Sequence, residues 1–405
     1  MPTNTLHSSP HHLSTHTSGI HWRTANAASL AAGLVAVREK TLALFDVYAN
    51  ANQLDIPLRD ELNPPLWELG HIAWFQEHWI ARNPTRHLGI AYDATQTRPP
   101  SVVANADAWY DSSQVAHNTR WHLPYLNVDA CKAYLTETLS QTLALLREAQ
   151  QSDAALYFFR LVLFHEAMHV EAALYMAQSL GIELNRCTIN LPNATDLIAP
   201  KAINMPHTAQ INIKKQSFIM GYSDVGFAFD NELNSHELEL PAYEIDAQCV
   251  TWQDYLAFVE DTQHELPRHM RRVATGHEVS LWGNWLPVDT QAPAVHVTYH
   301  EALRYCQWAK RRLPTEAEWE LAASLYDESH FVWGSVWEWT SSAFAPYAGF
   351  TPHPYRDYSA PWFHNHQVLR GASHATLPIM RHTRYRNFYL PERNDIFVGF
   401  RTCAL

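Results

Sequence analysis

The spacing of apolar residues predicts that the first half of the chain is helical. Apolar positions recur with helical periodicity in four segments, at residues 25–52, 66–80, 128–151 and 152–180. Asn63 and two prolines precede the second segment, and Gly181 follows the fourth, as expected at helix ends. Four helices of this size predict a four-helix bundle. The long loop at residues 82–127 is expected to be functional or partly structured.

The second half has a different pattern. From about residue 208, short strand-like segments alternate with turns, tryptophans and prolines. Helical periodicity returns at residues 251–260 and 298–311, and Thr315 with Glu318 has the spacing of a capping box that opens a further short helix. The chain is therefore predicted to be an α+β protein, with a helical bundle followed by a mixed domain.

Composition divides the chain into four parts. Residues 1–24 are rich in serine, threonine and histidine and predict a disordered tail. Residues 25–190 form the predicted bundle. Residues 191–207 contain the three prolines that mark the predicted linker, Pro192, Pro200 and Pro206, and residues 208–405 form the mixed domain.

Charge and cysteine content exclude several classes of function. The chain has 29 basic and 41 acidic residues and a net charge of −12, which argues against nucleic acid or an anionic membrane as partner. The longest apolar run is too short to cross a bilayer. The 5 cysteines are scattered and odd in number, so a disulfide framework or a cysteine-rich zinc site is not expected. These features predict a soluble, cytoplasmic protein.

Histidines provide the candidate chemistry. His165 and His169 are four residues apart on the fourth predicted helix, so both side chains lie on one face and can bind one metal ion. His71 lies on the apolar side of the second predicted helix, where it is either a packed core residue or a third ligand inside the bundle. Three neutral imidazoles suit Fe(II) for dioxygen chemistry or Zn(II) for hydrolysis.

The string His-Glu-x-x-His also matches the zinc metalloprotease motif. The longer form of that motif fails here, because Ala172 and Tyr175 stand where a glycine and a third histidine are required. Glu183 is poorly placed for the variant with a glutamate ligand. Glu166 and Glu171 are therefore predicted to support the site or the surface rather than to act as a hydrolytic base.

Taken together, several motifs resemble those of the ergothioneine-type sulfoxide synthases. They are Gly-His-x-x-Trp-Phe at 70–75, His-Glu-x-x-His-x-Glu at 165–171, Leu-Pro-Thr-Glu-Ala-Glu-Trp-Glu at 313–320, Val-Trp-Glu-Trp-Thr at 336–340, Val-Leu-Arg-Gly-Ala-Ser at 368–373 and Val-Gly-Phe-Arg at 398–401. The resemblance covers about residues 25–405. It implies a DinB-like iron-binding bundle and a C-type-lectin-like domain similar to the formylglycine-generating enzyme.

The resemblance also implies a set of ligands. His71, His165 and His169 correspond to the three ligands of Fe(2+). Asn387 corresponds to the residue that holds the betaine of N-trimethylhistidine (hercynine), with Phe388 as an aromatic wall beside it. The small-molecule partners implied are N-trimethylhistidine, dioxygen and a chalcogen donor.

The resemblance further implies a tyrosine that donates a proton during the reaction. Tyr355 and Tyr358 are the candidates, and Tyr347 is a weaker one. The alternative for all three is that they are packed surface aromatics. Arg393 either binds the chalcogen donor or forms a surface salt bridge.

Two positions depart from the synthases that use γ-glutamylcysteine. Tyr389 stands where those enzymes have an aspartate, and Met168 stands where they have a glutamine that contacts N-trimethylhistidine. With the stretches at 109–121 and 385–395, this pattern is most similar to the selenoneine synthase branch, whose members are implied to join a selenosugar to N-trimethylhistidine. An uncharged selenosugar does not need the carboxylate. The alternative is a sulfur donor, cysteine or γ-glutamylcysteine.

Two other classes compete with this prediction. A hydrolytic or non-catalytic DinB-like metalloprotein could share the three histidines. A formylglycine-generating oxidase is disfavoured, because Cys306 lies in a predicted helix and Cys403 lies near the end of the chain, so neither belongs to an obvious active pair.

Overall fold

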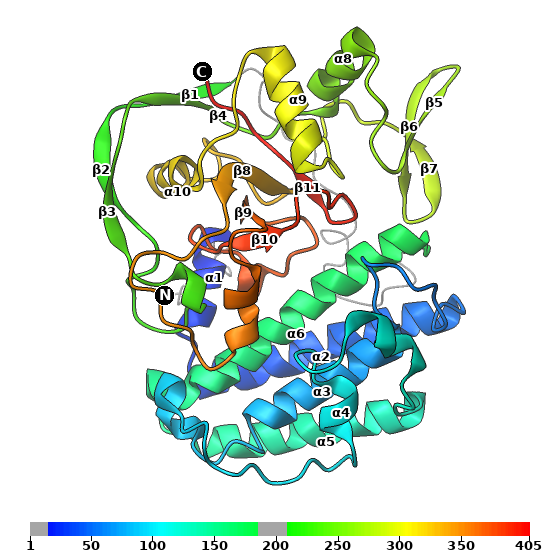
Figure 1. The fold of residues 1–405 in the computed structure, drawn as a ribbon, viewed down its shortest axis with the longest axis vertical. Helices are drawn as coiled ribbons and strands as arrows, with labels where there is room; N and C mark the ends of the chain where they lie inside the picture. Colours follow the sequence, from blue (N-terminus) through cyan, green and yellow to red (C-terminus); the bar gives the residue numbers. More distant parts are fainter. Residues whose placement is uncertain (1–14, 185–208) are drawn as a thin grey trace, which may run out of the picture.

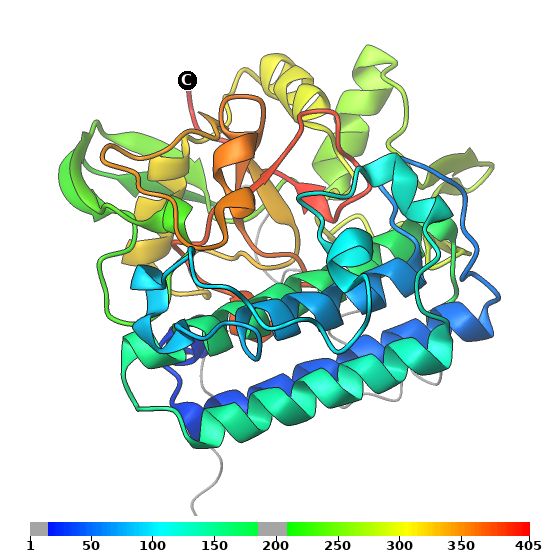
Figure 2. The same ribbon diagram turned by 60° about the horizontal axis from the view of Figure 1, so that its bottom comes forward.

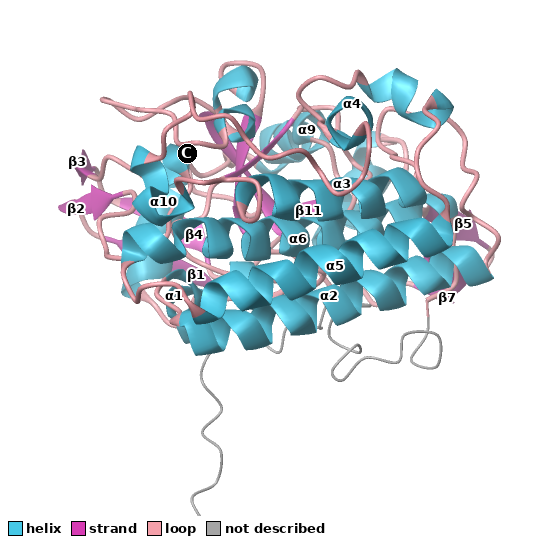
Figure 3. Ribbon diagram, turned by 90° about the horizontal axis from the view of Figure 1, so that it is seen from below, coloured by secondary structure: helices cyan, strands magenta, loops and turns pink. Residues whose placement is uncertain are grey.

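The helical half of the chain is a four-helix bundle. The computed structural model describes residues 15–184 and 209–405. The bundle helices are α2 (Ala27–Asn50), α3 (Pro65–Trp79), α5 (Val128–Arg147) and α6 (Asp153–Leu180). Helix α2 packs on α6, and α3 packs on α5 (Figure 1). Helices α3 and α6 form the layer next to the second half of the chain (Figures 2 and 3).

Local sequence explains where these helices begin and end. The side chains of Asn26, Asn127 and Ser152 each accept a hydrogen bond from a backbone N–H in the first turn of α2, α5 and α6. Helix α6 ends at Gly181, which has a φ of 68°, in the left-handed region that glycine adopts without strain. The four predicted helices are therefore confirmed.

The segment between α3 and α5 is partly structured. It contains the short helix α4 (Ala106–Tyr110) and two 3₁₀ turns, η1 (Arg86–Ala91) and η2 (His117–His122). Helix α4 packs on α3 at Gly70, where a Cβ atom would lie 2.1 Å from the ring of Tyr110. Only glycine at this position lets the two helices approach so closely.

The second half is the predicted mixed domain, which confirms the α+β class. Its central sheet has the strand order β10-β9-β8-β11, in which β11 runs parallel to β8 and the other pairs are antiparallel. Helix α10 packs against β8 and β9. The predicted capping box at Thr315 and Glu318 is present at the start of α10.

The strands are β1 (Gln210–Ile213), β2 (Gln216–Met220), β3 (His236–Leu240), β4 (Tyr243–Asp246), β5 (Met270–Val273), β6 (Gly276–Leu281), β7 (Asn284–Pro287), β8 (Trp337–Ala343), β9 (Gln367–Gly371), β10 (Asn387–Tyr389) and β11 (Val398–Gly399). The helices of this half are α8 (Trp252–Thr262), α9 (Tyr299–Ala309) and α10 (Glu316–Leu325). Within the described ranges, no helix is both long enough and apolar enough to span a membrane.

The prediction of a disordered tail at residues 1–24 is wrong for its C-terminal part, because Thr15–Arg23 forms helix α1. Arg23 explains this order, since its guanidinium makes two hydrogen bonds of 2.7 Å to the carboxylate of Glu232, and both side chains are buried. An ion pair between residues so far apart in sequence has no local signal. The predicted linker at 191–207 lies outside the described residues.

Glu171 joins α6 to the second half of the chain. Its carboxylate accepts hydrogen bonds from the indole N–H of Trp337 at 2.7 Å and from the hydroxyl of Ser373 at 2.6 Å. Burial raises the pKa of this carboxyl, against the lowering effect of its hydrogen bonds to Ser373 and Trp337. The prediction that Glu171 supports the structure is consistent with these contacts.

Replacing Glu171 by alanine is expected to lower the free energy of unfolding by about 1–3 kcal/mol, because two buried donors lose their acceptor. Glu171→Gln keeps an acceptor, so its free energy of unfolding should stay close to that of the wild type.

The stability that Glu171 provides should also depend on pH. The folded chain holds the Glu171 proton to a higher pH than the unfolded chain, because the pKa of this carboxyl is raised in the folded state. Protonated Glu171 therefore stabilises the fold at low pH, and this stabilisation is lost as the pH rises through the raised pKa of the folded state. Glu171→Gln should remove this pH dependence. Denaturant unfolding at several pH values measures both effects. As a control, Glu137→Ala on the exposed face of α5 should change stability by less than about 0.5 kcal/mol.

Candidate metal centre

Three histidines from two helices meet inside the bundle. His71 comes from α3, and His165 and His169 come from α6. The Nε2 atom of His165 lies 3.2 Å from Nε2 of His71 and 3.2 Å from Nε2 of His169. One potential ligand atom from each residue lies within 4.8 Å of the others, and in the described part of the chain this is the only such group of three histidine, cysteine or acidic residues. The spatial convergence expected from the sequence is therefore present.

The imidazole rings of His71 and His169 are each oriented by a hydrogen-bond acceptor at Nδ1, the nitrogen that faces away from the other histidines. Nδ1 of His71 lies 2.7 Å from the backbone carbonyl oxygen of Tyr110, and Nδ1 of His169 lies 2.5 Å from a carboxylate oxygen of Glu68. Each Nδ1 donates its proton to its acceptor, so the lone pair on each Nε2 is directed toward the other histidines. Such contacts are typical of histidines that bind metal.

Burial keeps two of the imidazoles neutral. It lowers the pKa of His71 to about 3, with His169 as the next cause, and it lowers the pKa of His165 well below its usual value. Neutral imidazole is the form that binds a metal ion. The donor set therefore fits a divalent transition metal with open coordination positions, and it suits both Fe(II) and Zn(II).

Glu166 has the position of the catalytic base in the zinc metalloprotease motif, but its carboxylate is already engaged. It accepts hydrogen bonds from Nε of Arg38 at 2.7 Å and from the hydroxyl of Thr41 at 2.8 Å. Arg38 and Glu166 are both buried, at 3% and 2% exposed. A carboxylate held in a buried ion pair is not free to activate water, which supports the structural role predicted for Glu166.

Tyr355 is the tyrosine candidate next to the histidines. Its ring lies 6.1 Å from the ring of His165 and 4.9 Å from that of Phe75, which stacks on His165 at 3.5 Å between centroids. Burial, with Asp357 and Asp111 nearby, raises the pKa of Tyr355 above its ordinary value. The phenol therefore keeps its proton at neutral pH, as a proton donor requires.

Tyr358 lies one step further from the histidines. Its ring is 5.9 Å from that of Tyr355, and its hydroxyl is 2.9 Å from the hydroxyl of Tyr385. The Tyr385 hydroxyl also lies 3.6 Å from the sulfur of Met168 on α6. Tyr347 instead lies under the guanidinium of Arg386, at 4.1 Å. Tyr355 and Tyr358 therefore lie on the path of contacts that starts at His165, whereas Tyr347 does not. The same path continues from Tyr358 through Tyr385 to Met168.

The residues expected to bind substrate lie around β10. The ring of Phe388 stacks on Phe344 at 4.0 Å and lies 5.8 Å from that of Tyr358. Asn387 precedes Phe388, and its side-chain oxygen accepts a hydrogen bond from the backbone N–H of Phe388 at 2.9 Å. A series of aromatic contacts therefore connects Asn387 and Phe388 with Tyr355 and His165.

Tyr389 and Arg393 form a second group at the end of β10. The guanidinium of Arg393 lies 5.1 Å from the Tyr389 ring. It also donates two hydrogen bonds, of 2.5 and 2.6 Å, to the buried carboxylate of Asp395. Arg393 therefore forms a salt bridge, but not the surface salt bridge that was one of the two expectations, because the side chains of Arg393 and Asp395 are only 26% and 2% exposed.

Two residues of the site were missed from the sequence. Glu68 lies one turn before His71 on α3, yet its partner is His169 on another helix. Tyr110 acts through its backbone carbonyl, which carries no sequence signal. Burial raises the pKa of Glu68, but the neighbouring His169 offsets this, and the pKa ends below its usual value. Glu68 is therefore an anion beside a candidate ligand.

Replacing Glu68 by glutamine is expected to weaken binding of a divalent metal ion about 10–100-fold, because His169 loses a charged acceptor that fixes its ring. Anaerobic titration of the apoprotein with Fe(2+) measures the change. Glu39→Gln, at an exposed position on α2, should leave affinity unaltered. Equal affinities for the wild type and Glu68→Gln would mean that the carboxylate does not orient the ligand.

Comparison with known proteins agrees with this arrangement. Residues 195–335 and 330–404 match the sulfatase-modifying factor enzyme 1-like domain, and residues 34–177 match the DinB superfamily. Hercynine oxygenase of Mycolicibacterium smegmatis is 28% identical, and the alignment covers 92% of this chain and 98% of that protein. Ergothioneine biosynthesis protein 1 of Schizosaccharomyces pombe is 23% identical over 85% of this chain and 52% of that protein. The formylglycine-generating enzyme of Streptomyces coelicolor is 24% identical over 53% of this chain and 94% of that protein.

These matches define an oxygen-dependent oxidoreductase built from a DinB bundle and a sulfatase-modifying-factor-like domain. The chain belongs to the family of the sulfatase-modifying factor enzyme 1-like domain, whose model covers more than half of it. The predicted resemblance to the ergothioneine-type sulfoxide synthases is confirmed by the added DinB match and by the similarity to hercynine oxygenase and ergothioneine biosynthesis protein 1.

Proposed function

We propose that the protein is a non-haem iron enzyme that uses dioxygen to join a chalcogen donor to C2 of the imidazole of N-trimethylhistidine, and that the donor is a selenosugar. The observation that carries the iron site is the convergence of His71, His165 and His169 on one point beside the second domain. Fe(2+) held by these three imidazoles supplies the dioxygen-activating chemistry.

The reaction balances with dioxygen as the only oxidant. The C2–H bond of the imidazole and the hydrogen–chalcogen bond of the donor break, and a carbon–chalcogen bond forms. When the product is the oxide, one oxygen atom ends on the chalcogen and the other leaves as water with the two hydrogens. We assign proton donation to Tyr355, with Tyr358 as the alternative, because the raised pKa of the Tyr355 phenol keeps it protonated beside His165.

We assign binding of N-trimethylhistidine to Asn387 and Phe388. A trimethylammonium group has no N–H with which to donate a hydrogen bond, so proteins hold it with aromatic faces and amide dipoles. The aromatic contacts from Phe388 through Tyr358 to Tyr355 support this assignment. Met168, whose sulfur lies 3.6 Å from the hydroxyl of Tyr385, is proposed to border the same site.

Tyr389 supports a selenosugar over a dipeptide donor. It provides an aromatic face where the enzymes that use γ-glutamylcysteine have a carboxylate, and a sugar packs on an aromatic face without needing a countercharge. The carboxylate of Asp395, at this end of β10, is paired with Arg393. A sulfur donor remains the alternative.

A donor competition tests the proposal. The iron-loaded enzyme is mixed anaerobically with N-trimethylhistidine and with a selenosugar, cysteine or γ-glutamylcysteine in separate reactions, and dioxygen is then admitted. We expect consumption of the selenosugar and a carbon–selenium product detected by mass spectrometry. Consumption of a thiol alone would assign the protein to the sulfur branch, and absence of dioxygen uptake with every donor would contradict the proposed function.

A further inference from the structure

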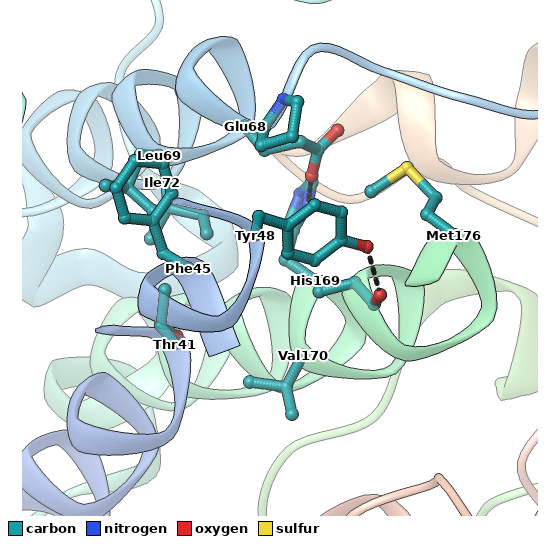
Figure 4. A pocket seen from close by; sticks show the side chains of 11 residues that line it. Thr41, Phe45, Tyr48, Glu68, Leu69, Ile72, His169, Val170 and Met176 are labelled. Carbon is teal, nitrogen blue, oxygen red and sulfur yellow. Dashed lines mark hydrogen bonds and ion pairs between the residues drawn. The ribbon is translucent and has the colours of Figure 1, made fainter. Parts of the chain in front are cut away.

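A small cavity lies inside the bundle beside His169 and Glu68. Its volume is about 30 Å³, and it is bordered by side chains from α2, α3 and α6 (Figure 4). The apolar members of its lining are Phe45, Pro65, Leu69, Ile72, Val170, Ala173 and Met176. The lining includes His169 and its partner Glu68, so the cavity directly adjoins the candidate metal centre.

The polar side chains that line this cavity already have partners in the protein. Thr41 donates its hydroxyl to Glu166 at 2.8 Å, Tyr48 donates its hydroxyl to the carbonyl oxygen of Ala173, and His169 is bound to Glu68. Figure 4 shows the contact of Tyr48 with α6 and that of Glu68 with His169. A water molecule needs two to four polar partners to be stable in a cavity, whereas most of this lining is apolar and its few polar side chains are already hydrogen-bonded within the protein.

The size of the cavity limits its occupant. Sites for organic ligands enclose about 300–1,000 Å³, so neither N-trimethylhistidine nor a sugar fits. A volume of at least about 10–15 Å³ is needed to hold one water-sized molecule, and apolar cavities of this kind stay dry and take up xenon. The remaining candidates are small apolar molecules. Dioxygen is the one that the proposed reaction consumes.

We propose that this cavity, formed by the residues around Ala173 and Ile72, is a dioxygen-binding site that holds the gas next to the metal centre. This inference rests on the proposed function, because it takes dioxygen to be the substrate. Dioxygen is weakly hydrated and gains dispersion contacts with the buried side chains that it does not have in water. The site therefore raises the local concentration of dioxygen beside His169 while the organic substrates bind on the side of the second domain.

Xenon tests the cavity without any turnover. Crystals of the full-length protein pressurised with xenon are expected to show an anomalous difference peak between Phe45, Ile72 and Ala173. Ala173→Leu should remove the peak, because its side chain fills the space while the backbone carbonyl that binds Tyr48 is retained. Ordered water in place of xenon, or no peak in the wild type, would overturn the proposal even if the enzyme turned over normally.

Kinetics then test whether the occupant is dioxygen. Ala173→Leu is expected to raise the KM for dioxygen threefold or more and to leave the KM for N-trimethylhistidine unchanged. Val170→Ile adds a single methylene group and should give a smaller rise, which provides a second variant if Ala173→Leu does not fold. Ala36→Leu, in an exposed groove between α2 and α5, adds the same bulk away from the cavity and should change neither constant.

The two proposals fail in different ways. A xenon peak in an enzyme that takes up no dioxygen with any donor would contradict the proposed function and, with it, the assignment of dioxygen as the occupant. A normal KM for dioxygen in a folded Ala173→Leu enzyme that lacks the xenon peak would overturn the dioxygen site alone.

Discussion

Replacing His165 by alanine is expected to abolish iron binding and to reduce turnover by at least about 1,000-fold, or about 4 kcal/mol of transition-state stabilisation. Nε2 of His165 lies between those of His71 and His169, at 3.2 Å from each, so the variant loses the central member of the group. The loss of affinity should exceed the about 10–100-fold cost of changing a residue that only supports a ligand. Metal analysis after anaerobic loading, with rate measurements on the same sample, measures both effects.

The controls separate a lost ligand from a lost fold. His165 stacks on Phe75, so the variant must first give the far-ultraviolet circular dichroism and unfolding transition of a folded bundle. His169→Ala removes a partly exposed ligand and should give the same loss of metal if His165→Ala is unstable. His300→Ala, with 56% of the side chain exposed on α9, should retain iron and activity. Stoichiometric iron in folded His165→Ala would contradict the proposed site.

Much of the fold could be predicted because its signals are local. Helix periodicity, capping residues and glycine stops depend on neighbours within one or two turns, and they located the four bundle helices and α10. Helix α1 was missed because its order depends on the pairing of Arg23 with Glu232, 209 residues later. No local pattern encodes a contact of that range.

The three histidines of the candidate site could be predicted from the sequence, whereas the groups that orient them could not. The spacing of His165 and His169 on one helix is a local pattern, and the apolar face around His71 placed that residue inside the bundle. The residues that orient these rings were not predictable. One is a backbone carbonyl, at Tyr110, and the other is a carboxylate on a different helix, at Glu68. The second half contributes Tyr355 only through the packing of the two domains.

Replacing Glu166 by alanine is expected to lower the free energy of unfolding by about 3–5 kcal/mol. Arg38 is 3% exposed, and without Glu166 its charge remains buried with neutral partners only, the carbonyl of Leu135 and the side-chain oxygen of Gln76. Denaturant unfolding measures the loss. Removing both charges in Arg38→Met/Glu166→Leu should recover much of it, because a buried ion pair and a well-packed apolar pair of similar volume have similar stability.

The activity of Glu166→Gln distinguishes the proposed enzyme from a zinc peptidase. In a peptidase the glutamate is the general base, and its amide would eliminate hydrolysis with little effect on stability. Here the carboxylate binds Arg38 and Thr41, so the folded fraction of Glu166→Gln should retain iron and most of its turnover while its stability falls. Loss of turnover at unchanged stability and unchanged iron content would instead place Glu166 in the chemistry, because neither the fold nor the metal would then explain the loss.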